Sequence, residues 1–202
     1  MSHERRFDPA KLAKLDSPDR RARMPPAAVA AALELEPHAR VADVGAGSGY
    51  VTFALLDAEP PPAVIHAVDV SEPMLDELVR RAAAHARGGA VHVHVAPAET
   101  LPLEAASVER VVLGNVFHEL DDAARALAEA RRVLAPAGRV VILDWERPDG
   151  ARGAAEIGPP YEHRVASGDV ERALEVAGFD DVRRHDGFRD VYALSARRAA
   201  SA

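Results

Sequence analysis

A glycine-rich segment, VADVGAGSGY at residues 41–50, carries the strongest chemical signal in the sequence. Gly45, Gly47 and Gly49 stand at alternate positions, directly after a short apolar run that contains Asp43. Glycine permits the backbone angles of a tight turn and lets a ligand approach the main chain closely. The segment therefore predicts a strand-to-helix turn whose backbone contacts a ligand.

Three familiar glycine-rich motifs do not fit this segment. A dinucleotide fingerprint requires G-x-G-x-x-G, but Tyr50 or Thr52 stands where the third glycine belongs. A Walker loop requires a lysine and a hydroxyl residue after its second glycine, and the segment has neither. A serine-hydrolase elbow needs glycine two residues either side of Ser48, where Ala46 and Tyr50 stand. The remaining pattern is D-x-G-x-G-x-G, which leaves the ligand open.

Asp69 is the second residue with a predicted ligand contact. It ends the next apolar run along the chain, twenty residues beyond Gly49. A carboxylate in that place suits two hydrogen bonds from a ribose diol. Because any nucleoside carries such a diol, Asp69 favours a nucleoside-like ligand without identifying it.

His118 is the best candidate for proton transfer, because it closely follows a buried run over residues 108–113. A neutral imidazole accepts a proton from a hydroxyl or an amine near pH 7. The alternative is a structural histidine that caps the helix beginning at Asp121 or packs in the loop. Glu119 beside it is interpreted as a solvated or capping carboxylate.

An acceptor pocket is predicted around the end of the run over residues 139–144 and the irregular stretch that follows it. Asp144 and Trp145 stand at the end of that run, where they suit a pocket wall, and Tyr161–Arg164 lie in the longest irregular stretch of the chain. Loops of that length in compact domains are often functional. We predict substrate contacts for Trp145, His163 and Arg164, with plain packing and an ordinary proline-stiffened connection as the alternatives.

His92 and His94 alternate with valines over residues 91–95. Two imidazoles on one strand face form a candidate metal pair. An edge strand with one solvent-facing side explains the alternation more simply. We therefore predict no metal site.

The composition excludes several classes of protein. The chain has 202 residues, 48% hydrophobic and 28% charged, with a formal net charge of −7, which suits one globular domain. Its basic pairs are scattered, which argues against a nucleic-acid partner. The sequence contains no cysteine, which rules out disulfides, thiol nucleophiles and cysteine–zinc sites. No signal peptide or apolar run of ~20 residues is present, so we expect a cytoplasmic protein without a membrane partner; the oligomeric state stays open.

Hydrophobic patterning predicts the elements that position these residues. Helices are expected to begin at Ser48, Ser71, Asp121 and Ser167, and a turn is expected over 135–138. The last two strands flank Gly187 so closely that they must form an antiparallel hairpin. The predicted fold is α/β, a doubly wound, mostly parallel seven-stranded sheet with this C-terminal hairpin. The strands are expected over residues 41–44, 63–68, 91–95, 108–113, 139–144, 182–185 and 191–195.

Five segments in order resemble the motifs of the class I S-adenosylmethionine-dependent methyltransferases, and specifically small bacterial and archaeal members similar to the quinone-biosynthesis enzymes. VADVGAGSGY resembles the first motif, AVDVSEPML the acidic motif after the second strand, and APAETLPL the adenine-side loop. VVLGNVFHELDD and RRVLAPAGRVVILDW resemble the fourth and fifth strands. The resemblance covers nearly the whole chain. It implies a Rossmann-like methyltransferase fold with S-adenosylmethionine as cofactor.

The resemblance also implies a role for each matching residue. The backbone of the glycine turn holds the methionyl part of the cofactor, and Asp69 accepts hydrogen bonds from the ribose hydroxyls. The adenine lies between two segments, one after the second strand and one after the third. Family members usually carry an acidic residue where this chain has Pro97, and Glu99 is the candidate replacement. The implied cofactor-binding residues are Asp43, Gly45, Ala46, Gly47, Gly49, Asp69, Val70, Met74, Ala98, Glu99 and Asn115.

The implied organisation is a helical leader over residues 1–38 that covers the cofactor site, followed by a methyltransferase domain over residues 39–202. The implied function is methyl transfer to an unidentified small molecule. Two alternatives stay open. One is a nicotinamide-dependent oxidoreductase, which the glycine spacing disfavours, and the other is a catalytically silent module that binds S-adenosylmethionine.

Overall fold

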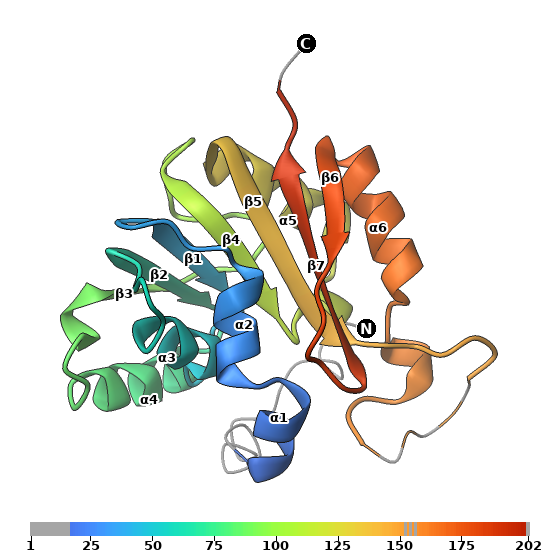
Figure 1. Cartoon of the computed structure of the whole chain (residues 1–202), viewed down its shortest axis with the longest axis horizontal. Helices are drawn as coiled ribbons and strands as arrows, with labels where there is room; N and C mark the ends of the chain where they lie inside the picture. The colour runs from blue at the N-terminus through green and yellow to red at the C-terminus, as the bar shows by residue number, and fades with distance from the viewer. Residues whose placement is uncertain (1–16, 152, 154, 156, 201–202) are drawn as a thin grey trace.

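A seven-stranded sheet forms the centre of the molecule (Figure 1). The computed structural model describes residues 17–151, 153, 155 and 157–200. The strand order is β3-β2-β1-β4-β5-β7-β6. The strands are β1 (Arg40–Val44), β2 (Val64–Asp69), β3 (Val91–Val95), β4 (Val108–Gly114), β5 (Leu134–Trp145), β6 (Phe179–Arg184) and β7 (Val191–Arg198).

The first five strands are parallel, whereas β7 runs antiparallel to both β5 and β6. The predicted fold class is therefore confirmed. The chain winds outward from β1 to β3 and then crosses over to β4 on the other side of β1. This reversal makes the β1–β4 boundary the switch point of the sheet, where open α/β folds bind their ligands. The glycine-rich segment follows β1 directly at that boundary.

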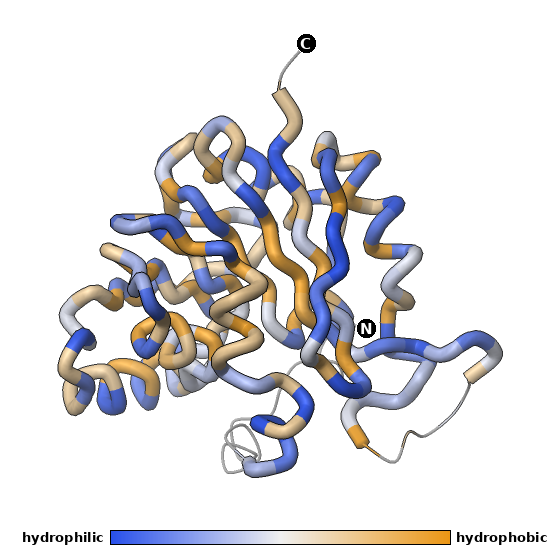
Figure 2. The backbone as a smooth tube through the Cα atoms, in the orientation of Figure 1, coloured by the Kyte–Doolittle hydropathy of each residue, from blue (hydrophilic) through white to orange (hydrophobic). Residues whose placement is uncertain are grey.

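Helices cover both faces of the sheet (Figure 1). Side chains of α2 and α3 pack on one face together with Val141 and Leu143 of β5. Side chains of α5 and α6 pack on the other face with Val140 and Ile142. Because successive residues of β5 enter opposite cores, its run Val140–Leu143 is apolar without interruption, as Figure 2 shows for the middle of the sheet. The helices are α1 (Pro18–Arg23), α2 (Pro26–Ala32), α3 (Tyr50–Leu56), α4 (Glu72–Ala82), α5 (Ala123–Val133) and α6 (Ser167–Val176), with the 3₁₀ turns η2 (Gly88–Ala90), η3 (Phe117–Glu119) and η4 (Tyr161–His163).

The predicted helix starts are only partly right. Ser48 does not cap α3, because Gly49 holds the cap position in the left-handed conformation, at φ 94°. Ser71 occupies the cap position of α4, but its side chain makes no capping hydrogen bond. Asp122 does cap α5, since its carboxylate accepts the backbone N–H of Arg125.

The turn predicted over residues 135–138 is wrong, because β5 runs through it. The register between β4 and β5 shifts there: Val108 is opposite Leu134, while Arg110 is opposite Arg139. Ala137 takes φ 62° within this shift. The proline and glycine that indicated a turn mark an irregularity in a strand instead.

Within the described part of the chain, no helix is both long and apolar enough to cross a membrane.

Candidate functional site

The three glycines of the turn after β1 differ in what surrounds them. All have positive φ angles, of 71° at Gly45, 53° at Gly47 and 94° at Gly49. A Cβ atom at Gly45 would lie 2.6 Å from a side-chain atom of Val116, and one at Gly49 would lie 2.7 Å from the ring of Phe53. A Cβ atom at Gly47 would meet no described atom within 4 Å. Gly47 therefore faces open space, as a position in contact with a ligand must.

Asp69 at the end of β2 lies against this turn. One carboxylate oxygen accepts the backbone N–H of Gly47 at 2.8 Å, and the other accepts that of Ser71 at 2.8 Å. Burial raises the pKa of Asp69, although the N–H donors oppose the shift. Val70 follows with 46% of its surface exposed, although it is a large apolar residue. Asp69 and Val70 thus present a carboxylate and an apolar surface side by side, which suits a nucleoside.

Asp43 lies inside the molecule beneath the turn. It is 1% exposed, and its carboxylate accepts the hydroxyl of Thr52 at 2.6 Å, which ties β1 to α3. Burial raises the pKa of Asp43 to about 6, the nearby charge of Asp69 adds to the rise, and the Thr52 hydroxyl and Arg20 partly oppose it. The two carboxylates therefore place negative charge beside and beneath the turn.

A measurable pH dependence follows from the raised pKa of Asp43. The pKa of Asp43 is about 6 in the folded protein and near 3.8 in the unfolded chain, so the folded carboxyl binds a proton more tightly. As the pH rises from about 4 to 6, ionisation of Asp43 therefore lowers the free energy of unfolding. Asp43→Asn removes this loss. We expect the free energy of unfolding of the variant, relative to the parent, to grow by about 3 kcal/mol between pH 4 and pH 7. Urea titrations at several pH values measure it, and a constant difference between the two proteins would contradict the account.

Asn115 follows β4 with a positive φ of 59°. Its side-chain nitrogen donates to the sulfur of Met24 at 3.3 Å. Its side-chain oxygen is buried and finds no hydrogen-bond partner among the described residues. A buried acceptor of this kind costs about 1–3 kcal/mol when it stays unpaired. The oxygen therefore marks a place where a donor from a ligand fits.

S-adenosylmethionine fits this combination of groups. Its sulfonium and ammonium groups are positively charged and so complement the two carboxylates. Its ammonium and hydroxyl groups are hydrogen-bond donors. Asn115 offers a free acceptor, Asp69 a carboxylate, and Gly47 open space beside the main chain. The site thus suits the cofactor on charge, on hydrogen bonding and on access.

Two other predicted cofactor residues point away from the open space. The side chain of Ala46 is buried in the small apolar cluster beneath α4, so only its backbone faces the turn. The carboxylate of Glu99 accepts the backbone N–H of Asp122 at 3.3 Å, while its carbonyl oxygen accepts from Arg125. Glu99 is thereby directed toward the start of α5. Its role as a replacement for an acid at Pro97 stays a prediction.

His118 forms a buried pair with Asp144. Its Nδ1 lies 2.7 Å from one Asp144 oxygen, and its backbone N–H donates to the other oxygen at 2.9 Å. The residues are 8% and 1% exposed. Burial lowers the pKa of His118, but the hydrogen bond and charge of Asp144 outweigh it and Glu119 adds to them, so the pKa is raised. A carboxylate that orients an imidazole and raises its pKa in this way is typical of a general base.

The structure corrects one alternative and adds one residue. His118 does not cap α5, because Asp122 does so. Asp144, which was expected to lie beside Trp145 in a wall of the acceptor pocket, is the partner of His118. The sequence did contain a signal for this pair. His118 follows β4 and Asp144 lies near the end of β5, and these two strands, which both carry long buried runs, are neighbours in the sheet.

The predicted substrate residues hold the segment after β5 in place. Arg164 is 5% exposed, and its guanidinium donates to the carbonyl oxygens of Pro159, Glu146 and Ile157. It also lies 5.1 Å from the centre of the Trp145 ring. His163 is exposed in η4. A substrate contact by Trp145, His163 or Arg164 stays a prediction. The observed role of Arg164 is to hold the loop after β5 through these three carbonyl groups.

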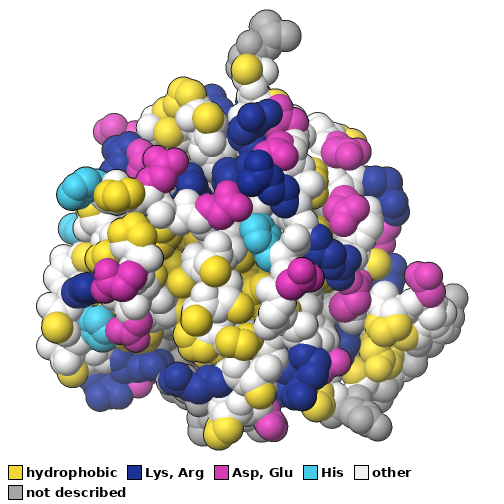
Figure 3. All heavy atoms as spheres, viewed as in Figure 1, with side chains coloured by type: hydrophobic (Ala, Val, Ile, Leu, Met, Phe, Trp, Pro, Cys, Tyr) yellow, Lys and Arg dark blue, Asp and Glu magenta, His cyan; other side chains and the backbone are white. Residues whose placement is uncertain are grey.

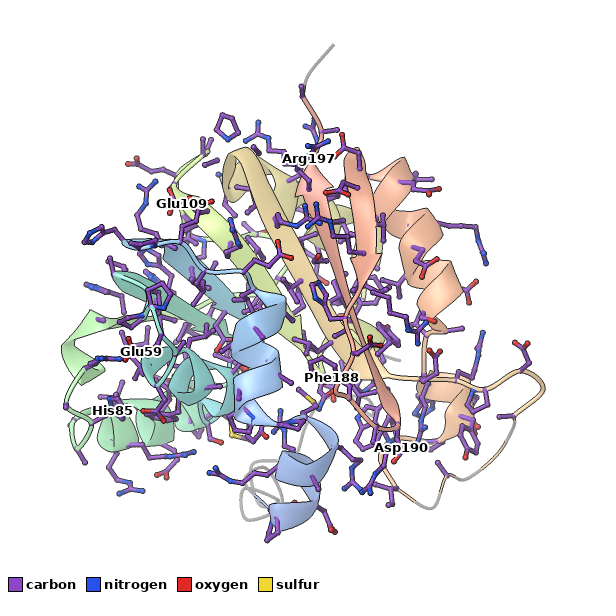
Figure 4. All side chains as sticks on the ribbon, viewed as in Figure 1. Glu59, His85, Glu109, Phe188, Asp190 and Arg197 are labelled. Atoms are coloured by element: carbon purple, nitrogen blue, oxygen red, sulfur yellow. The ribbon has the colours of Figure 1, made fainter. Side chains whose placement is uncertain are left out.

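The Trp145 ring joins this segment to the described part of the leader. Arg23 lies 5.6 Å from the centre of the ring, and a Cβ atom at Gly158 would lie 2.8 Å from a ring atom. The backbone N–H of Arg189 donates to the carbonyl oxygen of Arg23. Leader, loop and β6–β7 hairpin therefore meet at the end of the sheet where β5 ends. Figure 4 labels Asp190 of this hairpin, with Glu109 at the opposite end of the sheet.

Comparison with known proteins agrees with the geometry. A family model described as a methyltransferase domain matches residues 42–142. A ubiquinone/menaquinone biosynthesis C-methyltransferase of Geotalea daltonii is 30% identical over 57% of this chain and 49% of its own length. A malonyl-[acyl-carrier protein] O-methyltransferase of Halorhodospira halophila is 37% identical over 76% of this chain and 53% of its own length. The chain thus spans about half the length of these relatives.

The structural comparison extends over almost the whole chain. The crystal structure of a SAM-dependent methyltransferase from Aquifex aeolicus matches with a TM-score of 0.83 and 26% identity. The match covers 96% of this chain and all of that one. The resemblance seen in the sequence and the cofactor that it implies are confirmed. With half of its length matched by the family model and its fold shared throughout, the chain belongs to the class I S-adenosylmethionine-dependent methyltransferases.

Proposed function

We propose that the protein transfers a methyl group from S-adenosylmethionine to a small molecule whose accepting atom carries an exchangeable proton. The observation that carries this proposal is the His118–Asp144 pair at 2.7 Å. His118 follows Asn115 by three residues in the loop after β4, and Asp144 lies at the end of β5 beside it. A base in that place is useful only to a reaction in which the acceptor loses a proton.

The chemistry asks little more of the protein. The bound cofactor supplies an activated methyl group, so the chain has to align the acceptor, exclude water and take up a proton. Asp144 accepts a hydrogen bond from Nδ1–H of His118, so that the lone pair of the neutral ring is on Nε2, which can act as the base. A Glu119 oxygen lies 3.6 Å from Nε2. Nε2 of His118 would take up the proton that the acceptor loses, while the cofactor would supply the methyl group and leave as its demethylated product.

The leader over residues 1–38 is proposed to cover the cofactor, with the transferase domain over residues 39–202. The described part supports this: the Tyr50 hydroxyl donates to the carbonyl of Met24, whose sulfur contacts Asn115. The Arg20 guanidinium lies 4.2 Å from the centre of the Tyr50 ring. Residues 1–16 of the predicted leader lie outside the described part of the chain.

A small acceptor in the cytoplasm is the partner that we propose. The relatives named above act, by their names, on quinone precursors and on a carrier-bound malonyl group, so the accepting atom differs within this similarity. Charged side chains of both signs are interspersed on the face that carries α2, α3 and α4 (Figure 3). Such a face gives no support to a nucleic-acid partner.

Asp69→Ala tests the nucleoside half of the site. The change removes a carboxylate that is placed for two charge-assisted hydrogen bonds to the ribose. We expect cofactor affinity to fall by roughly 2–4 kcal/mol, measured by calorimetric titration. Asp76→Ala on the exposed side of α4 is the matched control and should bind like the parent. An Asp69 variant that is folded and binds like the parent would place the ribose elsewhere.

Turnover separates the proposal from its alternatives. The chain is incubated with S-adenosylmethionine and a panel of phenols, quinols, amines and carboxylates, and release of the demethylated cofactor is followed. We expect release with at least one acceptor class and a pH profile that rises through the pKa of His118. Tight cofactor binding with no turnover on any class would instead indicate the silent module.

A further inference from the structure

Three histidines meet on one face of the sheet, outside the site described above. His66 of β2 is directly opposite His92 of β3 in the strand register, and His94 lies two residues further along β3 on the same face. The ring centres of His92 and His94 lie 5.8 Å and 5.3 Å from that of His66. We propose that His66, His92 and His94 form a binding site for a divalent transition-metal ion of the class that prefers imidazole, such as Zn²⁺ or Ni²⁺.

Two of the three imidazoles already stand at ligand spacing. The Nδ1 atom of His66 lies 3.1 Å from the Nε2 atom of His94. Two nitrogen ligands of a tetrahedral zinc ion, each bonded at about 2.0–2.1 Å, lie about 3.4 Å apart. An ion therefore replaces the contact between the rings after a shift of a few tenths of an ångström. The proton that these nitrogens share moves to the other nitrogen of its ring, so both rings stay neutral.

The third ligand requires a side-chain rotation. As the side chains stand, no three His, Cys, Asp or Glu residues of the described chain are placed to hold an ion together. His92 is exposed, so its ring turns about χ1 and χ2 without displacing packed neighbours. Its Cα is the register partner of that of His66. The backbone thus holds all three ligands on two paired strands, which is a rigid frame for a small site.

The charges around the cluster permit a cation. Arg40 of β1 is the charged group that faces His66, and its guanidinium is paired with Glu109 at 2.6 Å. Burial and the neighbouring imidazoles hold the pKa of His66 and of His94 below the ordinary value. Both rings are therefore neutral near pH 7, as metal ligation requires. The sequence has no cysteine, and imidazole nitrogen is a ligand that suits these ions.

Binding there has a structural consequence. β3 is an edge strand of the sheet and is held on one side only, by β2. An ion shared by His66 and the two β3 histidines links these strands through their side chains. Because the ion binds the folded state, it raises stability by mass action. It also fixes the end of β3, from which the segment with Ala98 begins.

The test is a calorimetric titration of the full, untagged chain with NiCl₂ and with ZnCl₂, followed by thermal melts with and without each ion. The parent should bind one ion per chain and melt at a higher temperature, and a chelator should reverse the rise. His66→Gln, His92→Gln and His94→Gln should each weaken binding at least tenfold and lose the thermal shift. His163→Gln, an exposed histidine of η4, is the control and should behave as the parent.

Two results would overturn the proposal. One is a parent chain that binds neither ion at micromolar concentration. The other is any one of the three cluster variants that binds as tightly as the parent, since binding would then come from histidines elsewhere in the chain. Circular dichroism of each variant shows whether it is folded, and glutamine at these half-exposed positions preserves the polar face. Neither result depends on methyl transfer, so the site is tested apart from the proposed enzyme.

Discussion

Gly47→Val should abolish cofactor binding while leaving the protein folded. A side chain at this position meets no described atom within 4 Å, so the fold has room for it. The left-handed φ of 53° costs a branched residue about 1–2 kcal/mol, which lowers Tm by a few degrees. The same space is where the backbone must touch the cofactor, so we expect affinity to fall by at least about 100-fold, or ~2.7 kcal/mol.

Gly150→Val is the matched control for this change. Gly150 also has a positive φ, of 75°, and also meets no described atom around a built Cβ, but it lies in the segment after β5. The two variants should lose similar stability and differ in cofactor affinity. Equal affinities in titrations of both variants would show that the open space at Gly47 is not the cofactor's. Gly45→Val is a poorer test, because its side chain would collide with Val116 and disturb the fold itself.

His118→Ala should remove most methyl transfer and leave the cofactor dissociation constant within about threefold of the parent's. A positioned general base contributes about 10²–10⁴-fold to rate, and no described residue of the glycine turn is a hydrogen-bond partner of His118. Single-turnover rates with an acceptor found by the panel measure the loss. His85→Ala, in the turn after α4 where His85 pairs with Asp57, is the control. A variant with the parent's rate would make His118 structural.

Asp144→Asn separates a base from a packing residue. The carboxylate raises the pKa of His118 through its hydrogen bond and charge, so an amide in its place lowers that pKa. Methyl transfer requires the neutral imidazole, so the rising limb of the pH–rate profile should move to lower pH in the variant. Loss of rate with an unmoved limb would indicate that Asp144 only holds the loop. The pair would then be structural.

The sheet could be predicted because its strands are buried on both faces. Val140 to Leu143 form an uninterrupted apolar run, and the short spacing around Gly187 forces an antiparallel hairpin. Local capping was harder to predict. Serine is a good helix cap in general. After β1, however, the turn places Gly49, in the left-handed conformation, at the cap position of α3 instead of Ser48. The proline and glycine after Leu134 suggested a turn, yet pairing with β4 keeps the chain extended there.

The site shows the same division between local and non-local information. The glycine turn and Asp69 were visible because each has a local pattern at the end of a strand. The His118–Asp144 pair and the contact between His66 and His94 join residues that are 26 and 28 positions apart. Such contacts depend on the register of neighbouring strands, which composition and spacing do not specify. Arg164 was singled out by its loop, but its three carbonyl partners appear only in the folded chain.

The central claim is that the turn after β1 and Asp69 hold S-adenosylmethionine at the β1–β4 boundary. Calorimetric titration of the full chain with S-adenosylmethionine, with its demethylated product and with a nicotinamide dinucleotide tests it most directly. The account predicts one site per chain, micromolar dissociation constants for the first two ligands and much weaker binding of the dinucleotide. Dinucleotide binding as tight as that of S-adenosylmethionine, or no binding of S-adenosylmethionine, would contradict it.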